Sequence, residues 1–250
     1  MNLKADLGVQ SYCFRAFKEN ERVAALVREM GVSTIELCAV HVDFKQPETW
    51  DKVLQAYADA EVRVVSVGVQ GMSGDEPTER RFFEFARQAG AQHISVTFRI
   101  GQVPQAYRVA EQLAAEFDVK LGIHNHGGYD WLGSTTALEH ALSQTNERIG
   151  LCLDTAWALD ASQNPVKTAE QFLSRLYGAH LKDFVFDRAK KPSDVVIGEG
   201  NLDLPAFISA LQAAPSLTFA VIEYEGDIEN PLPALKECVT AAHNAIDAAK

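Results

Sequence analysis

Eight short runs rich in β-branched and aromatic residues recur along this chain, and each is followed by apolar residues at three- and four-residue spacing. This alternation predicts parallel strands joined by crossover helices. Eight such units without a leftover segment favour a closed barrel over an open sheet. The predicted strands are Leu7–Phe14, Thr34–Val40, Val62–Val69, His93–Arg99, Lys120–His126, Ile149–Asp154, Tyr177–Asp183 and Leu217–Glu225.

The length of the chain agrees with this fold. A chain of 250 residues has the usual size of an α/β barrel that forms one domain, so we expect a single (β/α)8 TIM barrel over residues 1–250. No linker rich in proline, glycine or serine interrupts the alternation. The one long connection, from Phe184 to Leu204, is polar and is predicted to be a loop over the barrel mouth.

Composition excludes several classes of partner. Acidic residues outnumber basic ones by 34 to 23, and the formal charge of −11 disfavours nucleic acid as a partner in the absence of a basic stripe. The four cysteines form no C-x-x-C pair and are interpreted as reduced thiols. No signal-peptide pattern and no stretch of ~18 apolar residues is found. We therefore expect a cytoplasmic protein that binds no membrane. A homo-oligomer is possible on the sequence alone.

In each of the last four predicted strands the ionisable residues occupy alternate positions, so they lie on the same face of the strand. Side chains alternate faces along a strand, and in a barrel one face meets the helices while the other meets the axis. The apolar residues suit the helix side, so the ionisable set is predicted to face inward. These residues come late in their strands, at the rim where barrel enzymes carry their sites. His124, Asp154, His180 and Glu223 come from four consecutive strands and can converge on one point.

Two imidazoles and two carboxylates are groups that commonly bind a divalent metal ion in proteins. Without a cation the two acids would repel each other. The alternative is four buried polar groups that are each satisfied by their own hydrogen bonds. We therefore predict one divalent metal ion at the rim.

Other residues near this rim have two interpretations each. His126 is either a hydrogen-bonded core residue or part of the site, and Lys182 is either a catalytic cation or an ion-pair partner of Asp183 or Glu225. Glu225 shares the inward parity of its strand and is expected to contact the substrate.

Three residues are candidates for contact with the substrate from other segments. Glu36 faces inward in the second strand and either meets the substrate or forms a salt bridge behind it. Trp157 is either a platform for a sugar ring or a lid over the core. Glu199, between two glycines in the long connection, either reaches inward or lies in a solvated turn.

Seven short motifs lie in order along essentially the whole chain. They are Gly8-Val9-Gln10-Ser11-Tyr12, Ile35-Glu36-Leu37, Asn125-His126-Gly127-Gly128, Leu153-Asp154-Thr155, His180-Leu181-Lys182-Asp183, Gly198-Glu199-Gly200 and Ile222-Glu223-Tyr224-Glu225. With these motifs the chain resembles the sugar phosphate isomerase/epimerase family, the xylose isomerase-like TIM barrels. This group also includes endonuclease IV, inosose dehydratases and ketose 3-epimerases.

The resemblance implies that His124, Asp154, His180 and Glu223 bind the metal. Position 124 departs from the glutamate of most members and resembles a subset that carries His-Asn-His on strand five. Trp157 stands where many members have a substrate-binding histidine. Imidazole in place of a carboxylate makes a bound ion a stronger Lewis acid and favours Mn, Fe, Co, Ni or Zn over Mg.

The predicted function is that of a metal-dependent isomerase or epimerase of a sugar or keto-sugar, phosphorylated or not, acting through a metal-stabilised enediolate. Glu223 or His126 would be the base, and Lys182 would stabilise or protonate the oxyanion. Two alternatives stay open. One is a lyase or dehydratase that eliminates a β-substituent from a 3-keto-sugar or keto-inositol, and the other is a non-catalytic binding subunit.

Overall fold

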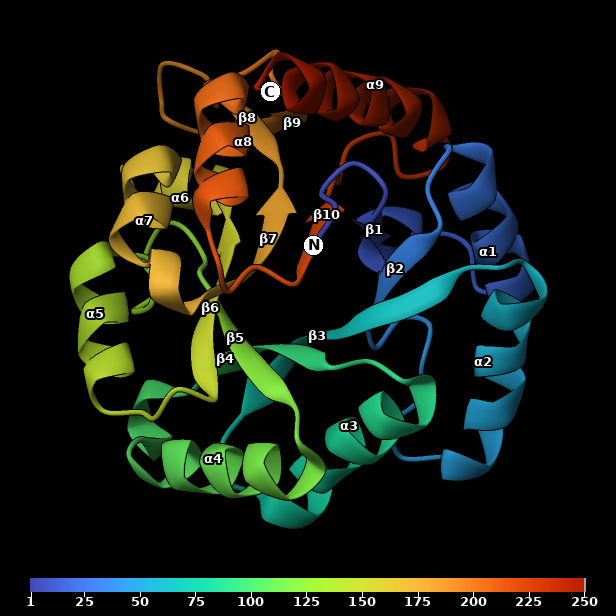
Figure 1. The fold of residues 1–250 in the computed structure, drawn as a ribbon, viewed down its shortest axis with the longest axis vertical. Coiled ribbons are helices and arrows are strands. Elements are labelled where there is room, and N and C mark those ends of the chain that lie inside the picture. Colours follow the sequence, from blue (N-terminus) through green and yellow to red (C-terminus); the bar gives the residue numbers. More distant parts are fainter. Residues whose placement is uncertain (250) are drawn as a thin grey trace.

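The computed structural model describes residues 1–249 and shows a closed barrel of eight parallel strands (Figure 1). Its strands follow one another around the barrel in the order of the chain, and the last closes against the first. They are β1 (Leu7–Gln10), β2 (Thr34–Leu37), β3 (Arg63–Met72), β4 (His93–Phe98), β5 (Lys120–His124), β6 (Ile149–Asp154), β7 (Leu176–Leu181) and β10 (Phe219–Ile222). The predicted TIM barrel is confirmed.

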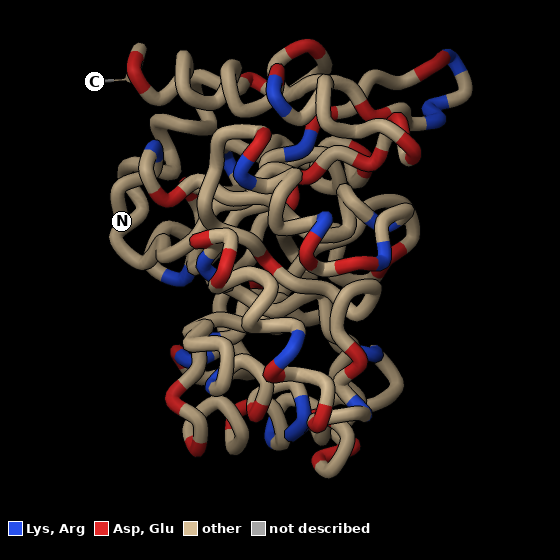
Figure 2. The backbone as a smooth tube through the Cα atoms, turned by 90° about the vertical axis from the view of Figure 1, so that its right-hand side faces the viewer, with Lys and Arg blue, Asp and Glu red and all other residues tan. Residues whose placement is uncertain are grey.

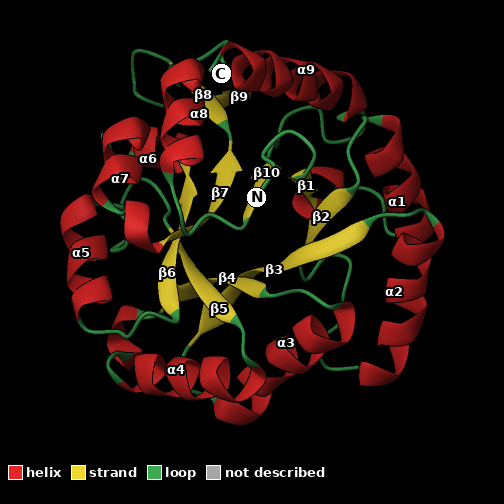
Figure 3. Ribbon diagram, viewed as in Figure 1, coloured by secondary structure: helices red, strands yellow, loops and turns green. Residues whose placement is uncertain are grey.

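Helices form a ring outside the strands (Figure 3). They are α1 (Asn20–Glu29), α2 (Trp50–Asp59), α3 (Glu76–Ala89), α4 (Gln105–Phe117), α5 (Thr135–Ser143), α6 (Thr155–Asp160), α7 (Pro165–Gln171), α8 (Leu204–Ala213) and α9 (Leu232–Ala248). Short 3₁₀ turns lie at Ser11–Phe14, Pro47–Thr49, Ile100–Gln102 and Leu173–Arg175. The apolar stripe of each longer helix packs onto the outer face of the barrel, as its three- and four-residue spacing predicts.

The sequence prediction is wrong for the connection that was expected to be a plain loop. Residues 184 to 204 include most of an antiparallel hairpin of β8 (Asp183–Phe186) and β9 (Pro192–Val195). Its turn lacks an Asn-Gly or Asp-Gly signal. Instead, the Asp187 carboxylate accepts hydrogen bonds from the backbone N–H groups of Ala189 and Lys191, and Lys190 has a φ of 60°.

The first predicted strand was also too long. The Gln10 side chain accepts a hydrogen bond from the backbone N–H of Tyr12, which ends β1 and starts the 3₁₀ turn Ser11–Phe14. This local bond competes with continuation of the strand. The turn places Tyr12 at the barrel mouth, where it lines a cavity described below.

Several expectations from composition agree with the structure. All four cysteines are buried and unpaired. Lys and Arg residues are interspersed with Asp and Glu over the face drawn in Figure 2. Among the described residues, no helix combines the length and the apolar character required to cross a bilayer.

The floor of the barrel contains a buried histidine. His93 is 4% exposed, and its ring lies 5.5 Å from the ring of Phe219, which fills the space next to Gly178. Because the Thr218 hydroxyl donates to the Tyr177 carbonyl, His93 Nε2 must donate to Thr218 Oγ1, at 2.7 Å. Burial, helped by Lys120, lowers the pKa of His93 to about 4.

We predict that His93 makes stability depend on pH. The unfolded chain binds a proton at this residue below about pH 6.5, whereas the folded chain does so only near pH 4, so stability falls as the pH drops through this window. The unfolding free energy of wild type should fall between about pH 7 and pH 4.5. In His93→Gln this fall should be smaller by roughly 2 to 3 kcal/mol, as measured by urea denaturation. His140→Gln on the exposed side of α5 is the control. An unchanged pH dependence in His93→Gln would contradict the prediction.

Candidate metal centre and active site

Four buried ligand-type side chains meet at the carboxyl-terminal rim. One ligand atom from each of His124, Asp154, His180 and Glu223 lies within 4.8 Å of the others. His124 Nε2 lies 3.1 Å from His180 Nδ1 and 3.6 Å from Asp154 Oδ2, and His180 Nδ1 lies 2.7 Å from Glu223 Oε2. The convergence that strand parity predicted is therefore confirmed.

Two side chains align the strands that carry this cluster. Asn125 Nδ2 donates to the Asp154 carbonyl at 3.0 Å, and the Asp154 N–H donates to Asn125 Oδ1 at 2.8 Å, which joins the ends of β5 and β6. Thr155 Oγ1 accepts from the backbone N–H of Lys182 at 2.9 Å and so joins β6 to β7. Side chains thus continue the strand pairing at the level of the cluster, where residues 124, 154 and 180 must stay in register.

The free oxygen of Asp154 shows that the cluster fits a cation. Asp154 Oδ1 accepts from the Trp157 N–H at 2.8 Å and caps α6. Asp154 Oδ2 is buried within the cluster, yet within residues 1–249 it has no hydrogen-bond donor. An unpaired buried carboxylate oxygen is costly, and a divalent ion held by these four residues would satisfy it.

His180 is held from both sides. Its Nε2 lies 2.5 Å from Glu36 Oε2, so its Nδ1 is the nitrogen that faces the cluster. Glu36 also accepts hydrogen bonds from Gln10 and Ser66, both at 2.7 Å. Burial opposes the charge of Glu36, but His180 and the hydroxyl groups of Ser95 and Ser66 outweigh burial and lower its pKa. A carboxylate on the outer nitrogen fixes the orientation of a ligand histidine.

The position of Glu36 gives no support to the substrate contact expected for it. It is fully buried and is not among the residues that line the cavity above the cluster. Of its two interpretations, the structure supports the salt bridge, because the side chain reaches His180 before it reaches the barrel mouth.

Lys182 lies beside the cluster and is 1% exposed. Its Nζ pairs with Glu225 Oε1 and lies 3.9 Å from Glu223 Oε1 and from Asp194 Oδ1. Burial opposes its charge, but Glu223, Asp154 and the other carboxylates outweigh burial and raise the pKa of Lys182. The ammonium group is therefore placed behind two carboxylates, Glu223 and Glu225, that face the cavity.

A cavity of about 500 Å³ opens above the cluster. Its lining includes His124 and Glu223 of the cluster together with His126, Trp157 and Glu225, three of the candidate residues from the sequence. Residues that sequence reasoning missed complete the wall: Gln10, Tyr12, Cys38, Ala39, Val40, Gly68 and Val69. Of these, Gln10 and Tyr12 belong to the first of the seven motifs, which was the available signal.

The aromatic side of the cavity is made by His126 and Trp157. The His126 ring centroid lies 4.7 Å from that of His124 and 5.9 Å from that of Trp157. Trp157 packs edge-on against Phe184, and Lys182 Nζ lies 5.1 Å from its ring centroid. Burial and the neighbouring His124 lower the pKa of His126 to about 4, so its imidazole is neutral near pH 7.

Glu199 is not brought to this cavity. The flanking glycines fold around the buried carboxylate of Asp183, which accepts backbone hydrogen bonds at 2.9 Å from Gly198 and Gly200. A Cβ at Gly200 would lie 2.5 Å from Asp183 Oδ1. Glu199 itself is exposed and borders a different depression beside α8 and α9. The substrate contact expected for Glu199 is therefore not supported, and the motif shapes the loop instead.

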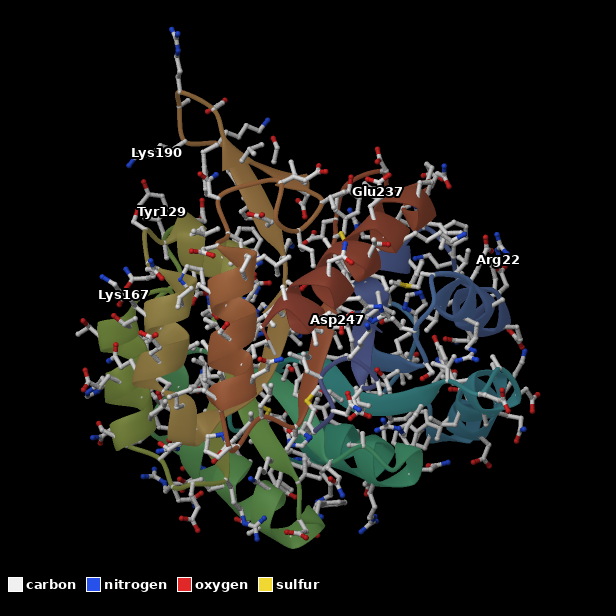
Figure 4. All side chains as sticks on the ribbon, turned by 45° about the horizontal axis from the view of Figure 1, so that its top comes forward. Arg22, Tyr129, Lys167, Lys190, Glu237 and Asp247 are labelled. Atoms are coloured by element: carbon white, nitrogen blue, oxygen red, sulfur yellow. The ribbon has the colours of Figure 1, made fainter. Side chains whose placement is uncertain are left out.

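The hairpin β8–β9 begins at the site and extends away from it. The backbone N–H of Glu225 donates to Asp194 Oδ1 in β9 at 3.0 Å, which ties the hairpin to the segment after β10. Figure 4 shows the hairpin standing out from the barrel, with Lys190 labelled near its tip and Tyr129 on the same side. The base of the hairpin thus packs behind Trp157 and Glu225, which line the cavity, while its tip extends away from them.

Comparisons with known proteins agree with this architecture. The model of the family described as xylose isomerase-like TIM barrel matches residues 24–241. The chain is 28% identical over 133 residues to the rhizopine catabolism protein MocC of Rhizobium meliloti, covering 48% of this chain but only 40% of MocC. It is 23% identical over 222 residues to 3-oxo-isoapionate decarboxylase of Pectobacterium atrosepticum, covering 80% and 78% of the two chains.

Among solved structures, the chain is similar to 3-keto-D-glucoside 4-epimerase of E. coli. The TM-score is 0.72 at 17% identity, and the match covers 96% of this chain and 99% of that one. At this identity the similarity supports the barrel fold alone.

We predict that Asp154→Asn removes metal-induced stabilisation and leaves the metal-free fold intact. The amide keeps an oxygen for the Trp157 N–H but removes the unpaired charge. The melting temperature of the metal-free variant should equal or exceed that of the metal-free wild type. Added Mn²⁺ or Co²⁺ should stabilise the variant much less than wild type, because its metal affinity should be at least about 10-fold weaker.

The matched control is Asp203→Asn, because Asp203 also caps a helix, α8, by accepting from the Ala206 N–H. This variant should bind metal as wild type does. An Asp154→Asn protein that is stabilised by Mn²⁺ or Co²⁺ as strongly as wild type would exclude Asp154 from the metal site.

Proposed function

Because the chain belongs to the xylose isomerase-like TIM barrel family, we propose that it is a divalent-metal-dependent isomerase or epimerase of a sugar or keto-sugar. The observation that carries the proposal is the buried cluster of His124, Asp154, His180 and Glu223 at the base of an open cavity. The cavity volume of about 500 Å³ is that of a small-molecule site.

The cluster would hold one divalent ion. Two imidazole nitrogens and two carboxylate oxygens suit Mn, Fe, Co, Ni or Zn better than Mg, which prefers oxygen ligands alone. When bound, the ion would supply Lewis-acid stabilisation of negative charge on a substrate oxygen. Glu36 and Asn125 are the positioning residues, because they fix His180 and Asp154 without facing the cavity.

Residues that line the cavity would transfer the proton. Glu223 is 7% exposed and faces the cavity, and His126 stands beside it with a neutral ring. Either can take a proton from the carbon next to a carbonyl group, which leaves an enediolate. Lys182 supports Glu223 and Glu225 from behind, and its positive charge stabilises negative charge that develops in the cavity. Return of the proton to another carbon isomerises the sugar, and return to the opposite face epimerises it.

Elimination is the second candidate. Position 124 is a histidine, so the site has one fewer carboxylate with which to exchange protons on two faces of a substrate. A single base that removes a proton next to a carbonyl group suffices to expel a β-substituent. This observation favours a lyase or dehydratase of a 3-keto-sugar or keto-inositol over a symmetric two-carboxylate epimerisation.

We predict that the metal-loaded protein exchanges a carbon-bound proton of a keto-sugar with solvent. A panel of ketoses and 3-keto-glycosides is incubated in D₂O, and deuterium uptake is followed by NMR. Uptake with an intact skeleton identifies an isomerase or epimerase, and loss of a substituent identifies a lyase. Metal-loaded protein that exchanges no proton on any member of the panel would contradict the proposal and favour a binding subunit.

Two variants identify the base. Glu223→Gln should lower the exchange rate by about 100-fold or more if Glu223 is the base, and His126→Gln should do so if His126 is. Metal content is measured for each variant, because Glu223 also belongs to the cluster. Glu199→Gln is the control for a carboxylate outside the cavity, and its exchange rate should equal that of wild type.

A further inference from the structure

The cavity above the metal centre has an acidic wall. Glu223 and Glu225 line it, and Asp194 of β9 accepts a hydrogen bond from the backbone N–H of Glu225 at 3.0 Å. Asp194 and Glu225 come from the segments that follow β7 and β10, the seventh and eighth strands of the barrel. In TIM barrels these two segments frequently bind a phosphate group of the substrate. Here the same position carries negative charge.

The backbone groups that could cradle a phosphate at this position are already used. The glycine-containing loop between β9 and α8 turns several N–H groups toward the buried carboxylate of Asp183. The donors, each at 2.9 Å from a carboxylate oxygen, are Gly198, Gly200, Asn201 and Leu202. Successive N–H groups of this kind form an anion site in other proteins. The chain thus supplies its own anion to this loop.

Basic side chains are not offered to a ligand either. Within residues 1–249 no Lys or Arg lines the cavity. Lys182 is 1% exposed and is surrounded by carboxylates. Arg15 donates to the Glu225 carbonyl at 2.5 Å. Lys45 and Arg81 line a different depression, beside α3.

A bound metal ion would not reverse the charge of the wall. The carboxylates of Asp154 and Glu223 would neutralise a divalent ion. Lys182 then faces two further carboxylates, Glu225 and Asp194, so the wall keeps an excess of negative charge. In a partly buried site this excess repels a phosphate or carboxylate group more strongly than it would in water.

The same wall suits hydroxyl groups. Lys182 pairs with Glu225 Oε1, whereas Glu225 Oε2 accepts no hydrogen bond from the described residues. Oε2 is therefore left to accept hydrogen bonds from a ligand that lies in the cavity. Trp157 adds an aromatic surface that suits the C–H face of a sugar ring.

We propose that the substrate is an uncharged polyhydroxy ketone and that Glu225 and Asp194 exclude phosphorylated and carboxylated sugars. The inference rests on the function proposed for this cavity and chooses between sugars with and without a phosphate group. Glu225 accepts hydrogen bonds from hydroxyl groups of the substrate. Asp194 is a positioning residue that holds the backbone of Glu225 and adds its own charge.

The test compares neutral sugars with their own phosphate esters on the metal-loaded protein. The pairs are fructose, tagatose and methyl 3-keto-glucoside with their 6-phosphates, and calorimetric titration is combined with proton exchange in D₂O. At least one neutral sugar should bind about 100-fold or more tightly than its ester. Raising NaCl from about 20 to about 300 mM should narrow this difference, because salt screens the repulsion of the ester.

Two variants test the charge of the wall. Glu225→Gln and Asp194→Asn should each narrow the difference about 3- to 10-fold, since each removes one negative charge and nearly keeps the shape of the side chain. The readout compares two ligands on the same variant, so a general loss of affinity does not produce it. Glu199→Gln removes one negative charge outside the cavity and is the matched control, with an unchanged difference.

The possible failures are distinguishable. An ester that binds as tightly as its neutral sugar, or that alone exchanges a proton, would overturn this inference and leave the isomerase or epimerase function standing. A difference that both variants leave unchanged would show that shape excludes the ester, and would overturn the role of the two carboxylates. Exchange on no member of any pair would contradict the proposed function and this inference with it.

Discussion

Two carboxylates and two histidines are buried side by side at the end of the barrel, an arrangement that suits a divalent cation. The Asp154 oxygen that faces the cluster has no donor among the described residues, and Glu223 Oε2 lies 2.7 Å from His180 Nδ1. Burial of such acids is costly unless a cation compensates them. The surrounding structure serves this cluster: Asn125 and Thr155 hold the three strands in register, and Glu36 turns His180 toward the centre.

The sequence was sufficient for the barrel and for the position of the cluster, because both follow from periodicity. Alternation of strands and helices predicts the fold, and a parity of two predicts which residues of the last four strands point inward. The sequence was not sufficient to predict the role of a side chain that has two possible polar partners in the folded chain. Parity placed Glu36 inward, but only the packing of His180 shows that Glu36 lies behind this histidine. Glu199 follows the backbone around Asp183, a long-range contact that spacing cannot reveal.

The hairpin depends on contacts that are likewise hidden from sequence spacing. The hairpin turn is closed by the Asp187 side chain instead of a glycine signal, and the hairpin is tied to the site by Asp194. The cluster lies at the ends of barrel strands, whereas the hairpin belongs to a connection between strands, the kind of segment that often carries binding residues on a rigid scaffold.

The most direct measurement is anomalous X-ray diffraction from crystals of the cobalt-loaded protein, recorded on both sides of the cobalt absorption edge. We predict one anomalous peak at about 2.0 to 2.2 Å from His124 Nε2, His180 Nδ1 and oxygens of Asp154 and Glu223. A peak elsewhere on the molecule, or none in this cluster while its four side chains keep their places, would contradict the central claim.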